Sequence, residues 1–216
     1  MHVVITGATG EIGKCLLPLL LKDENINQIT VFSRRTLAVE HQKLTVLIVD
    51  FNSLSSVNLA GADVGICCLG TTMAKAGSKS AFERVDFDYV VGFAKLMKAN
   101  GASQFHVVSA SGANKTSFFF YNRVKGAMED EVRSLSFNTT CIYRPALLDS
   151  ERTEKRSGER FAILLFRLIN PLLIGPLKHF KSIKTKVVAA GIHARIVQPA
   201  SGLHIIASGD ISASSD

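Results

Sequence analysis

Three side chains that could do acid–base chemistry lie close together in the second half of the chain. Tyr121 and Lys125 are four residues apart, so on a helix they share one face. A tyrosine has a pKa of about 10 in water, and a lysine one helical turn away lowers that pKa by stabilising the phenolate. Ser111 follows a predicted strand and could hydrogen-bond the same substrate oxygen. Together they predict proton transfer to a carbonyl, with Tyr121 as the acid, Lys125 tuning it and holding a ribose, and Ser111 polarising the carbonyl.

A tyrosine–lysine pair also occurs by chance on ordinary helix surfaces, so its meaning depends on the elements that position it. The run from His2 to Thr6 is mostly β-branched and predicts a buried strand. Gly7, Gly10 and Gly13 follow, and after them apolar residues recur at helical spacing. This arrangement permits a tight turn, close approach of a pyrophosphate and close packing of helix on strand. Free N–H groups at the helix start then face the anion. The pattern favours a dinucleotide site over a purely structural turn.

The end of the second predicted strand (28–33) bears on the choice of cofactor. In dinucleotide-binding proteins an acid here accepts from the ribose hydroxyls of NAD, whereas an arginine pairs with the 2′-phosphate of NADP. This chain has Ser33, Arg34 and Arg35 and no acid. Two guanidinium groups can hold one phosphate through charge-assisted hydrogen bonds. The alternative is a pair of solvated loop arginines; we favour NADP(H) over NAD(H).

Strands and helices continue to alternate along the chain. Further strands are predicted at 44–49, 63–69, 105–109 and 139–143, with helices at 79–100 and 121–135. This alternation predicts an α/β fold of the Rossmann type, with a doubly wound, mostly parallel sheet. We expect one domain, 1–216, in which 1–149 form the cofactor-binding core. Residues 150–216 form a small extension with helices and a late strand, 203–207, which would cover the reactive end of the cofactor as a substrate pocket and lid.

Ligands of such sheets bind at the carboxyl ends of the strands. Asp50 and Phe51 would flank the adenine, Gly70 would let the cofactor approach the backbone, and Thr71 and Thr72 would offer hydroxyls. The residues expected to contact the cofactor are Gly7, Thr9, Gly10, Glu11, Ile12, Gly13, Ser33, Arg34, Arg35, Asp50, Phe51, Leu69, Gly70, Thr71, Thr72, Ser109, Tyr121, Lys125, Arg144 and Pro145.

Composition narrows the function classes. Of 216 residues 47% are hydrophobic and 20% charged, and the net charge is +7. The basic residues are not interleaved with stacking aromatics, so we expect no nucleic-acid partner. The four cysteines lack CxxC spacing and the histidines are scattered, which predicts no metal site and no disulfide framework. We see no secretory leader, and the apolar run 161–174 is interrupted and too short for a membrane span. A cytoplasmic location follows as the expectation.

Several motifs together resemble a known family. Residues 6–13 (Thr-Gly-Ala-Thr-Gly-Glu-Ile-Gly), Ser111 and the Tyr121/Lys125 pair resemble the extended or atypical branch of the short-chain dehydrogenase/reductase superfamily. The run Cys-Cys-Leu-Gly-Thr-Thr at 67–72 and the Tyr-Arg-Pro at 143–145 are similar to the family of the HIV Tat-interacting metastasis suppressor and its bacterial relatives. The resemblance extends from residue 1 to about 150. It implies a Rossmann fold that binds NADP(H), but it names no substrate, and the animal member is described as a regulator that acts through partner proteins.

Two positions depart from the superfamily pattern. Many relatives have an asparagine in the helix before the fifth strand, where it completes a proton relay, but here Asp86 stands at the matching position. Pro18 falls inside the first helix, where it should produce a kink.

Three functions remain open at this point. The first is an NADP(H)-dependent oxidoreductase of a small carbonyl substrate. The second is a regulatory or scaffold protein that binds NADP(H) and a protein partner without turnover. The third is an NAD(P)-dependent epimerase or dehydratase, which the small C-terminal region disfavours. Whether the chain forms a homodimer is also open.

Overall fold

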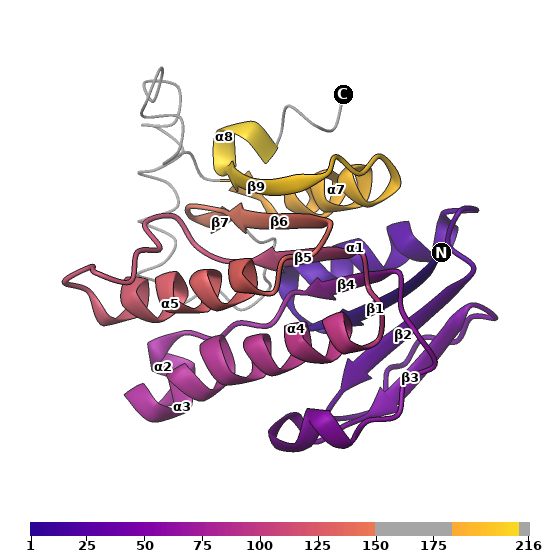
Figure 1. Cartoon of the computed structure of the whole chain (residues 1–216), viewed down its shortest axis with the longest axis horizontal. Helices are drawn as coiled ribbons and strands as arrows, with labels where there is room; N and C mark the ends of the chain where they lie inside the picture. Colours follow the sequence, from indigo (N-terminus) through magenta and orange to yellow (C-terminus); the bar gives the residue numbers. More distant parts are fainter. Residues whose placement is uncertain (150–182, 212–216) are drawn as a thin grey trace.

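The computed structural model describes residues 1–149 and 183–211 and shows helices on both faces of one seven-stranded sheet (Figure 1). Every neighbouring pair of strands is parallel, and the strand order is β3-β2-β1-β4-β5-β6-β9. The strands are β1 (His2–Thr6), β2 (Gln28–Ser33), β3 (Leu44–Ile48), β4 (Val64–Cys67), β5 (Gln104–Val108), β6 (Thr139–Arg144) and β9 (Gly202–Ala207). The predicted doubly wound Rossmann fold is confirmed.

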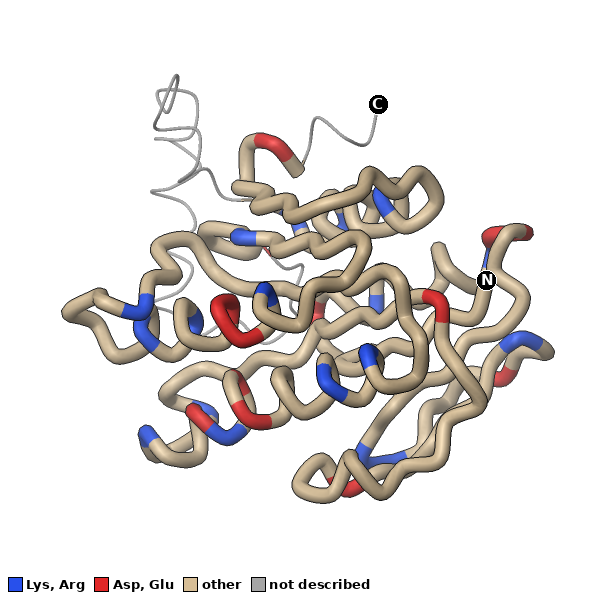
Figure 2. Tube along the Cα trace, in the orientation of Figure 1, with Lys and Arg blue, Asp and Glu red and all other residues tan. Residues whose placement is uncertain are grey.

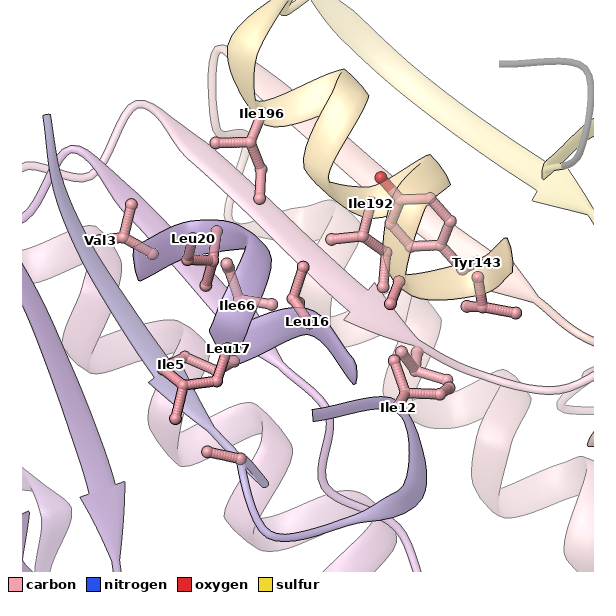
Figure 3. Packing of buried hydrophobic residues seen from close by; sticks show 14 of the residues in the cluster. Val3, Ile5, Ile12, Leu16, Leu17, Leu20, Ile66, Tyr143, Ile192 and Ile196 are labelled. Atoms are coloured by element: carbon pink, nitrogen blue, oxygen red, sulfur yellow. The ribbon is translucent and has the colours of Figure 1, made fainter. Parts of the chain in front are cut away.

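Two hydrophobic cores lie on opposite faces of this sheet. Successive side chains of a strand point to opposite faces, so Val3 and Ile5 enter one core while Val4 enters the other. Helices α1 (Glu11–Lys22) and α7 (Thr185–Val197) cover the first core (Figure 3). Helices α4 (Tyr89–Ala99) and α5 (Phe120–Ser134) cover the second. Cys67 and Cys68 also face opposite cores, as the alternation predicts.

The described residues also contain five shorter helical elements. They are η1 (Phe51–Ser56), α2 (Met73–Ala76), α3 (Lys79–Glu83), η2 (Arg84–Asp88) and α8 (Ser208–Ile211). The strand order reverses between β1 and β4, so the loops after these two strands diverge at the carboxyl edge of the sheet. Such a switch point is where doubly wound sheets bind their ligands.

The predicted helix at 79–100 is interrupted. It consists of α3, a π-helical turn (η2) and α4 in one continuous run. A π turn adds one residue to the helical turn, which changes the direction of the side chains around it. Asp86 lies in this turn and is fully buried. The interruption therefore brings an acid into the interior.

Residues 183–211 extend the main fold, because β9 pairs with β6 and α7 packs against α1. Their expected role as a substrate pocket and lid stays a prediction. A small second sheet pairs β7 (Leu148–Asp149) with β8 (Ile183–Lys184). The remainder of the expected extension, 150–182, lies outside the described residues.

Two further features of the described chain are the distribution of its basic residues and the hydropathy of its helices. Lysine and arginine are distributed over many elements of the described chain rather than along a single one (Figure 2). No helix among the described residues is long and apolar enough to cross a membrane.

Candidate functional site

The glycine turn after β1 has the backbone that the sequence predicts. Gly7 has a φ of +77°, and a Cβ there would lie 2.4 Å from the carbonyl oxygen of Cys68. A Cβ on Gly13 would lie 2.2 Å from the oxygen of Gly7, so a side chain would push α1 away from the turn. Gly10, at the start of α1, is more open, because a Cβ there would lie 3.2 Å from the oxygen of Gly7 and 3.9 Å from that of Cys68. The turn therefore leaves space at the helix N-terminus, which fits a pyrophosphate.

A pocket joins this turn to the end of β2. Its lining includes Gly7, Thr9, Ser33, Arg34, Arg35, Phe51 and Leu69. Ser33 organises the turn, because its hydroxyl donates to the carbonyl oxygen of Arg35 at 2.7 Å. The side chains of Arg34 and Arg35 are exposed, and neither forms an ion pair with another described residue. The geometry fits a 2′-phosphate site.

Other residues expected to contact the cofactor are engaged within the protein. Asp50 accepts hydrogen bonds from the backbone N–H and the side-chain amide of Asn52, and so caps η1. The hydroxyl of Thr72 accepts from the backbone N–H of Lys75 and caps α2. The side chain of Ile12 is buried in the core. For these residues a structural role is established, and contact with a cofactor stays a prediction.

Ser109 and Arg144 meet at a carboxylate that sequence reasoning missed. Glu129 in α5 is fully buried, and its Oε1 accepts from the Ser109 hydroxyl at 2.6 Å and from Arg144 Nε at 2.9 Å. Its Oε2 accepts from Arg144 Nη2 at 2.5 Å and from Arg133 Nη2 at 2.9 Å. The hydrogen bonds to Glu129 raise the pKa of Arg144. Ser109 and Arg144 thus hold β5, β6 and α5 together.

The turn that carries Ser111 lies against the start of α5. The backbone N–H of Ser111 donates to the carbonyl oxygen of Pro145 at 3.0 Å. Past Ser111, a Cβ on Gly112 would lie 3.2 Å from the amide nitrogen of Asn122, the neighbour of Tyr121. Gly126 allows this loop to approach, because a Cβ there would lie 2.2 Å from the backbone nitrogen of Lys115. The serine turn and the tyrosine helix are therefore adjacent.

Tyr121 lies in a partly buried, aromatic environment. Its ring centroid is 5.3 Å from that of the buried Phe82. Burial raises the pKa of Tyr121, the positive Lys125 lowers it, and the negative Asp86 raises it again; the net direction is upward. The expected net lowering of the Tyr121 pKa is therefore wrong, because burial raises this pKa by more than Lys125 lowers it. Tyr121 is protonated at neutral pH.

Lys125 forms a buried ion pair. Its Nζ lies 2.7 Å from Oδ1 of Asp86, and the two side chains are 4% and 0% exposed. The other oxygen of Asp86 accepts from the backbone N–H of Thr71 at 2.9 Å. A Cβ on Gly70 would lie 4.0 Å from Lys125 Nζ. The ammonium therefore lies beneath the loop after β4, beside the predicted cofactor site.

Two of the site residues that were not predicted, Glu129 and Gly126, could have been recognised from the sequence. Glu129 follows Tyr121 and Lys125 at the same four-residue spacing, which places all three on one face of α5. Gly126 directly follows Lys125 inside a helix, where glycine is unfavourable unless a close approach requires it. Among the described residues, no three or more His, Cys, Asp or Glu side chains gather where they could hold a metal ion.

Comparison with known sequences gives a family. A family model described as NAD(P)H-binding matches residues 7–162. Protein HTATIP2 of Rattus norvegicus is 42% identical over 169 residues, which cover 76% of this chain and 69% of the rat protein. The mitochondrial protein fmp52 of Aspergillus niger is 31% identical over 205 residues, covering 89% of this chain and 88% of the fungal protein.

Solved structures share the fold at low sequence identity. MoeE5 in complex with UDP-glucuronic acid and NAD has a TM-score of 0.71 and 15% identity, covering 97% of this chain and 76% of that chain. The human epimerase family protein SDR39U1 with NADPH has a TM-score of 0.64 and 15% identity, with coverage of 98% and 77%. The family model spans well over half of the sequence, and the resemblance to HTATIP2 expected from residues 67–72 and 143–145 is confirmed. The chain belongs to the NAD(P)H-binding family, with HTATIP2 and the fungal fmp52 proteins among its relatives.

Proposed function

We propose that this protein is an NADP(H)-dependent oxidoreductase that reduces a small carbonyl substrate, with Tyr121 as its acid. The observation that carries the proposal is the loop after β4, which borders both halves of the site. On one side, a Cβ on Gly7 would touch the carbonyl group of Cys68. On the other, Gly70 lies over the ammonium of Lys125. Tyr121 is on the same helix as this lysine, one turn away.

Each residue has a chemical task in this proposal. When bound, the reduced nicotinamide supplies the hydride. Tyr121, protonated at neutral pH, gives the proton of its hydroxyl to the carbonyl oxygen of the substrate. Ser111 donates a hydrogen bond to the same oxygen and stabilises the negative charge that develops there. Lys125 holds the ribose next to the nicotinamide and keeps a positive charge beside the phenol.

The preference for NADP(H) rests on Arg34 and Arg35, which are exposed beside the glycine turn. NADPH and NADH are titrated in parallel into the wild type and the Arg34→Ala/Arg35→Ala variant. We expect NADPH to bind more tightly to the wild type, and the variant to lose about tenfold or more of that affinity with little change for NADH. The matched control, Lys22→Ala/Lys184→Ala, removes two exposed charges elsewhere and should keep the preference. Equal binding of both cofactors to the wild type would contradict the proposal.

A turnover assay separates this function from the regulatory alternative. The purified protein is mixed with NADPH and a panel of aldehydes and quinones, with Tyr121→Phe as the control. Consumption of NADPH that disappears in Tyr121→Phe supports the reductase. Tight NADPH binding without turnover of any compound supports the NADP(H)-binding regulator that engages a protein partner. An epimerase or dehydratase would purify with oxidised cofactor and convert its substrate without net consumption.

The cellular location stays a prediction. The sequence favours the cytoplasm, whereas the fungal relatives are named as mitochondrial proteins. Fractionation of cells that express the tagged chain would decide between the two compartments.

A further inference from the structure

Asp86 joins three segments through its two carboxylate oxygens. It lies in the π turn η2 and is fully buried. Its Oδ2 accepts from the backbone N–H of Thr71, in the loop after β4. Its Oδ1 meets the ammonium of Lys125 in α5 at 2.7 Å and has no hydrogen-bond partner elsewhere among the described residues. One acid therefore supports the loop after β4 and the helix α5 at the same time.

The surroundings of this pair leave the ammonium dependent on Asp86. A buried ammonium is costly unless an opposite charge accompanies it, because burial favours the neutral amine. The neighbouring thiol of Cys67, in β4, does not compensate, since burial raises its pKa to about 12 and keeps it neutral. Tyr121, one turn before Lys125 on α5, is also neutral at neutral pH. Glu129, one turn after Lys125, is bound to the guanidinium groups of Arg133 and Arg144. The carboxylate of Asp86 is therefore the one negative charge that these groups offer the lysine.

We propose that Asp86 is a positioning residue that keeps Lys125 charged and in place beneath the loop after β4. The catalytic meaning of this role rests on the proposed function, in which Lys125 holds the ribose and acts on Tyr121. The charge-holding role itself requires neither cofactor nor substrate. It can therefore be tested on the protein alone.

Lys125 and Asp86 shift the pKa of Tyr121 in opposite directions. The direction of the shift in an Asp86 variant therefore shows whether Lys125 is still charged. Lys125 lowers the pKa of Tyr121 and Asp86 raises it, and the effect of the lysine is the larger of the two. If the lysine stayed charged without Asp86, an Asp86→Asn substitution would lower the pKa of Tyr121, because only a negative charge is lost. If Asp86 keeps the lysine charged, the substitution removes both charges, and the pKa of Tyr121 rises.

The experiment is a titration of tyrosinate by ultraviolet absorbance. The chain has three tyrosines and no tryptophan, so the background is small. Each variant is compared with the same variant carrying Tyr121→Phe, and the difference isolates Tyr121. The variants are Asp86→Asn, Lys125→Met and the double variant, with Asp88→Asn as a control. Asp88 lies in the same turn but is exposed, so its substitution should leave Tyr121 unchanged.

The proposal expects an upward shift for Asp86→Asn, an upward shift for Lys125→Met, and no further shift when Lys125→Met is added to Asp86→Asn. A downward shift in Asp86→Asn overturns it. A general loosening of the site would hydrate the phenol and also shift its pKa downward, so it cannot imitate the expected result. If Asp86→Asn fails to fold at neutral pH, adding Lys125→Met must restore folding, because the cost of burying the lysine without its carboxylate is then the cause; failure to restore it overturns the proposal.

The titration tests the role of Asp86 independently of the proposed function. A protein that turns over no carbonyl compound can still show the expected titrations, in which case the charge-holding role stands and the reductase does not. Where NADPH binds, a second readout follows. NADPH affinity of Asp86→Asn should fall more steeply with rising pH than that of the wild type, because its lysine loses the proton more readily.

Discussion

The hydroxyl of Ser109 donates a 2.6 Å hydrogen bond to Oε1 of Glu129, and this contact joins the end of β5 to the middle of α5. Arg144 binds the same carboxylate from the end of β6. Three elements that carry the candidate site thus share one buried anion. Ser111 lies two residues beyond Ser109, and its backbone N–H donates to the carbonyl oxygen of Pro145, the residue after Arg144.

Glu129→Ala should lower the free energy of unfolding by about 3 kcal/mol or more, because it leaves the Ser109 hydroxyl and a partly buried guanidinium without their partner. Urea unfolding measures the change. Glu131→Ala on the same helix is the control, since that side chain is exposed and should change stability by about 0.5 kcal/mol or less. Equal unfolding midpoints for the two variants would show that the anchor contributes little.

The sequence predicted the sheet well because each strand carries its own signal. The β-branched run of β1 and the glycines after it define a local structure that needs no distant partner. The roles of Gly7 and Gly13 follow from backbone geometry alone, and the close contacts at both positions agree with them. The face of α5 that carries Tyr121 and Lys125 also follows from spacing within one helix.

The partners of the polar side chains could not be predicted in the same way. Ser109 is 20 residues from Glu129, and Arg144 is 15 residues from it, so the chain must fold before the three can meet. The positions of Ser109 and Arg144 at strand ends suggested contacts with a cofactor, which stay a prediction. In the structure both side chains bind the carboxylate of Glu129. The π turn that buries Asp86 likewise could not be predicted, because no residue spacing in the sequence distinguishes it from an ordinary α-helical turn.

Two substitutions in the glycine turn should separate folding from cofactor binding. Gly13→Ala places a Cβ 2.2 Å from the oxygen of Gly7 and should destabilise the protein, because α1 must move away. Gly10→Ala meets a single close contact, 3.2 Å from the same oxygen, and should melt close to the wild-type temperature. It should still lose about tenfold or more of the NADPH affinity, because its methyl group occupies the space beside the helix N-terminus. Wild-type affinity in Gly10→Ala would place the pyrophosphate elsewhere.

Pro18 lies within α1 with its side chain exposed, and the helix continues past it to Lys22. The proline lacks the N–H that would bond to the carbonyl oxygen of Lys14. We expect Pro18→Ala to increase the free energy of unfolding by about 1–2 kcal/mol, the gain being reduced because alanine frees the unfolded chain. Urea unfolding checks this, with Lys14→Ala as an exposed control on the same helix. A less stable Pro18→Ala would mean that the packing of α1 depends on the proline.

His106 should make the stability of the protein sensitive to mild acid. The ring is buried between the Tyr143 hydroxyl, 3.0 Å from Nδ1, and the Gln104 side-chain oxygen, 3.3 Å from Nε2. The oxygen of Gln104 can only accept, so Nε2 carries the proton, and Nδ1 accepts from the tyrosine. Both contacts suit the neutral ring. Burial is the main cause that lowers the pKa of His106 from 6.5 to about 3.

The sign of the pH effect follows from this shift. Above the unfolded-state value of 6.5, His106 is neutral in both states and has no effect. As the pH falls from there towards about 3, the unfolded chain takes up a proton that the folded protein refuses, and the free energy of unfolding falls by about 1.4 kcal/mol per pH unit. His106→Gln should be less stable near neutral pH because it loses fitted contacts. Between about pH 7.5 and about pH 5 it should nevertheless lose about 2 kcal/mol less than the wild type. His41→Gln, at an exposed position, should keep the wild-type dependence. If His106→Gln and the wild type lose stability in parallel, the buried ring takes up its proton in the folded protein as well.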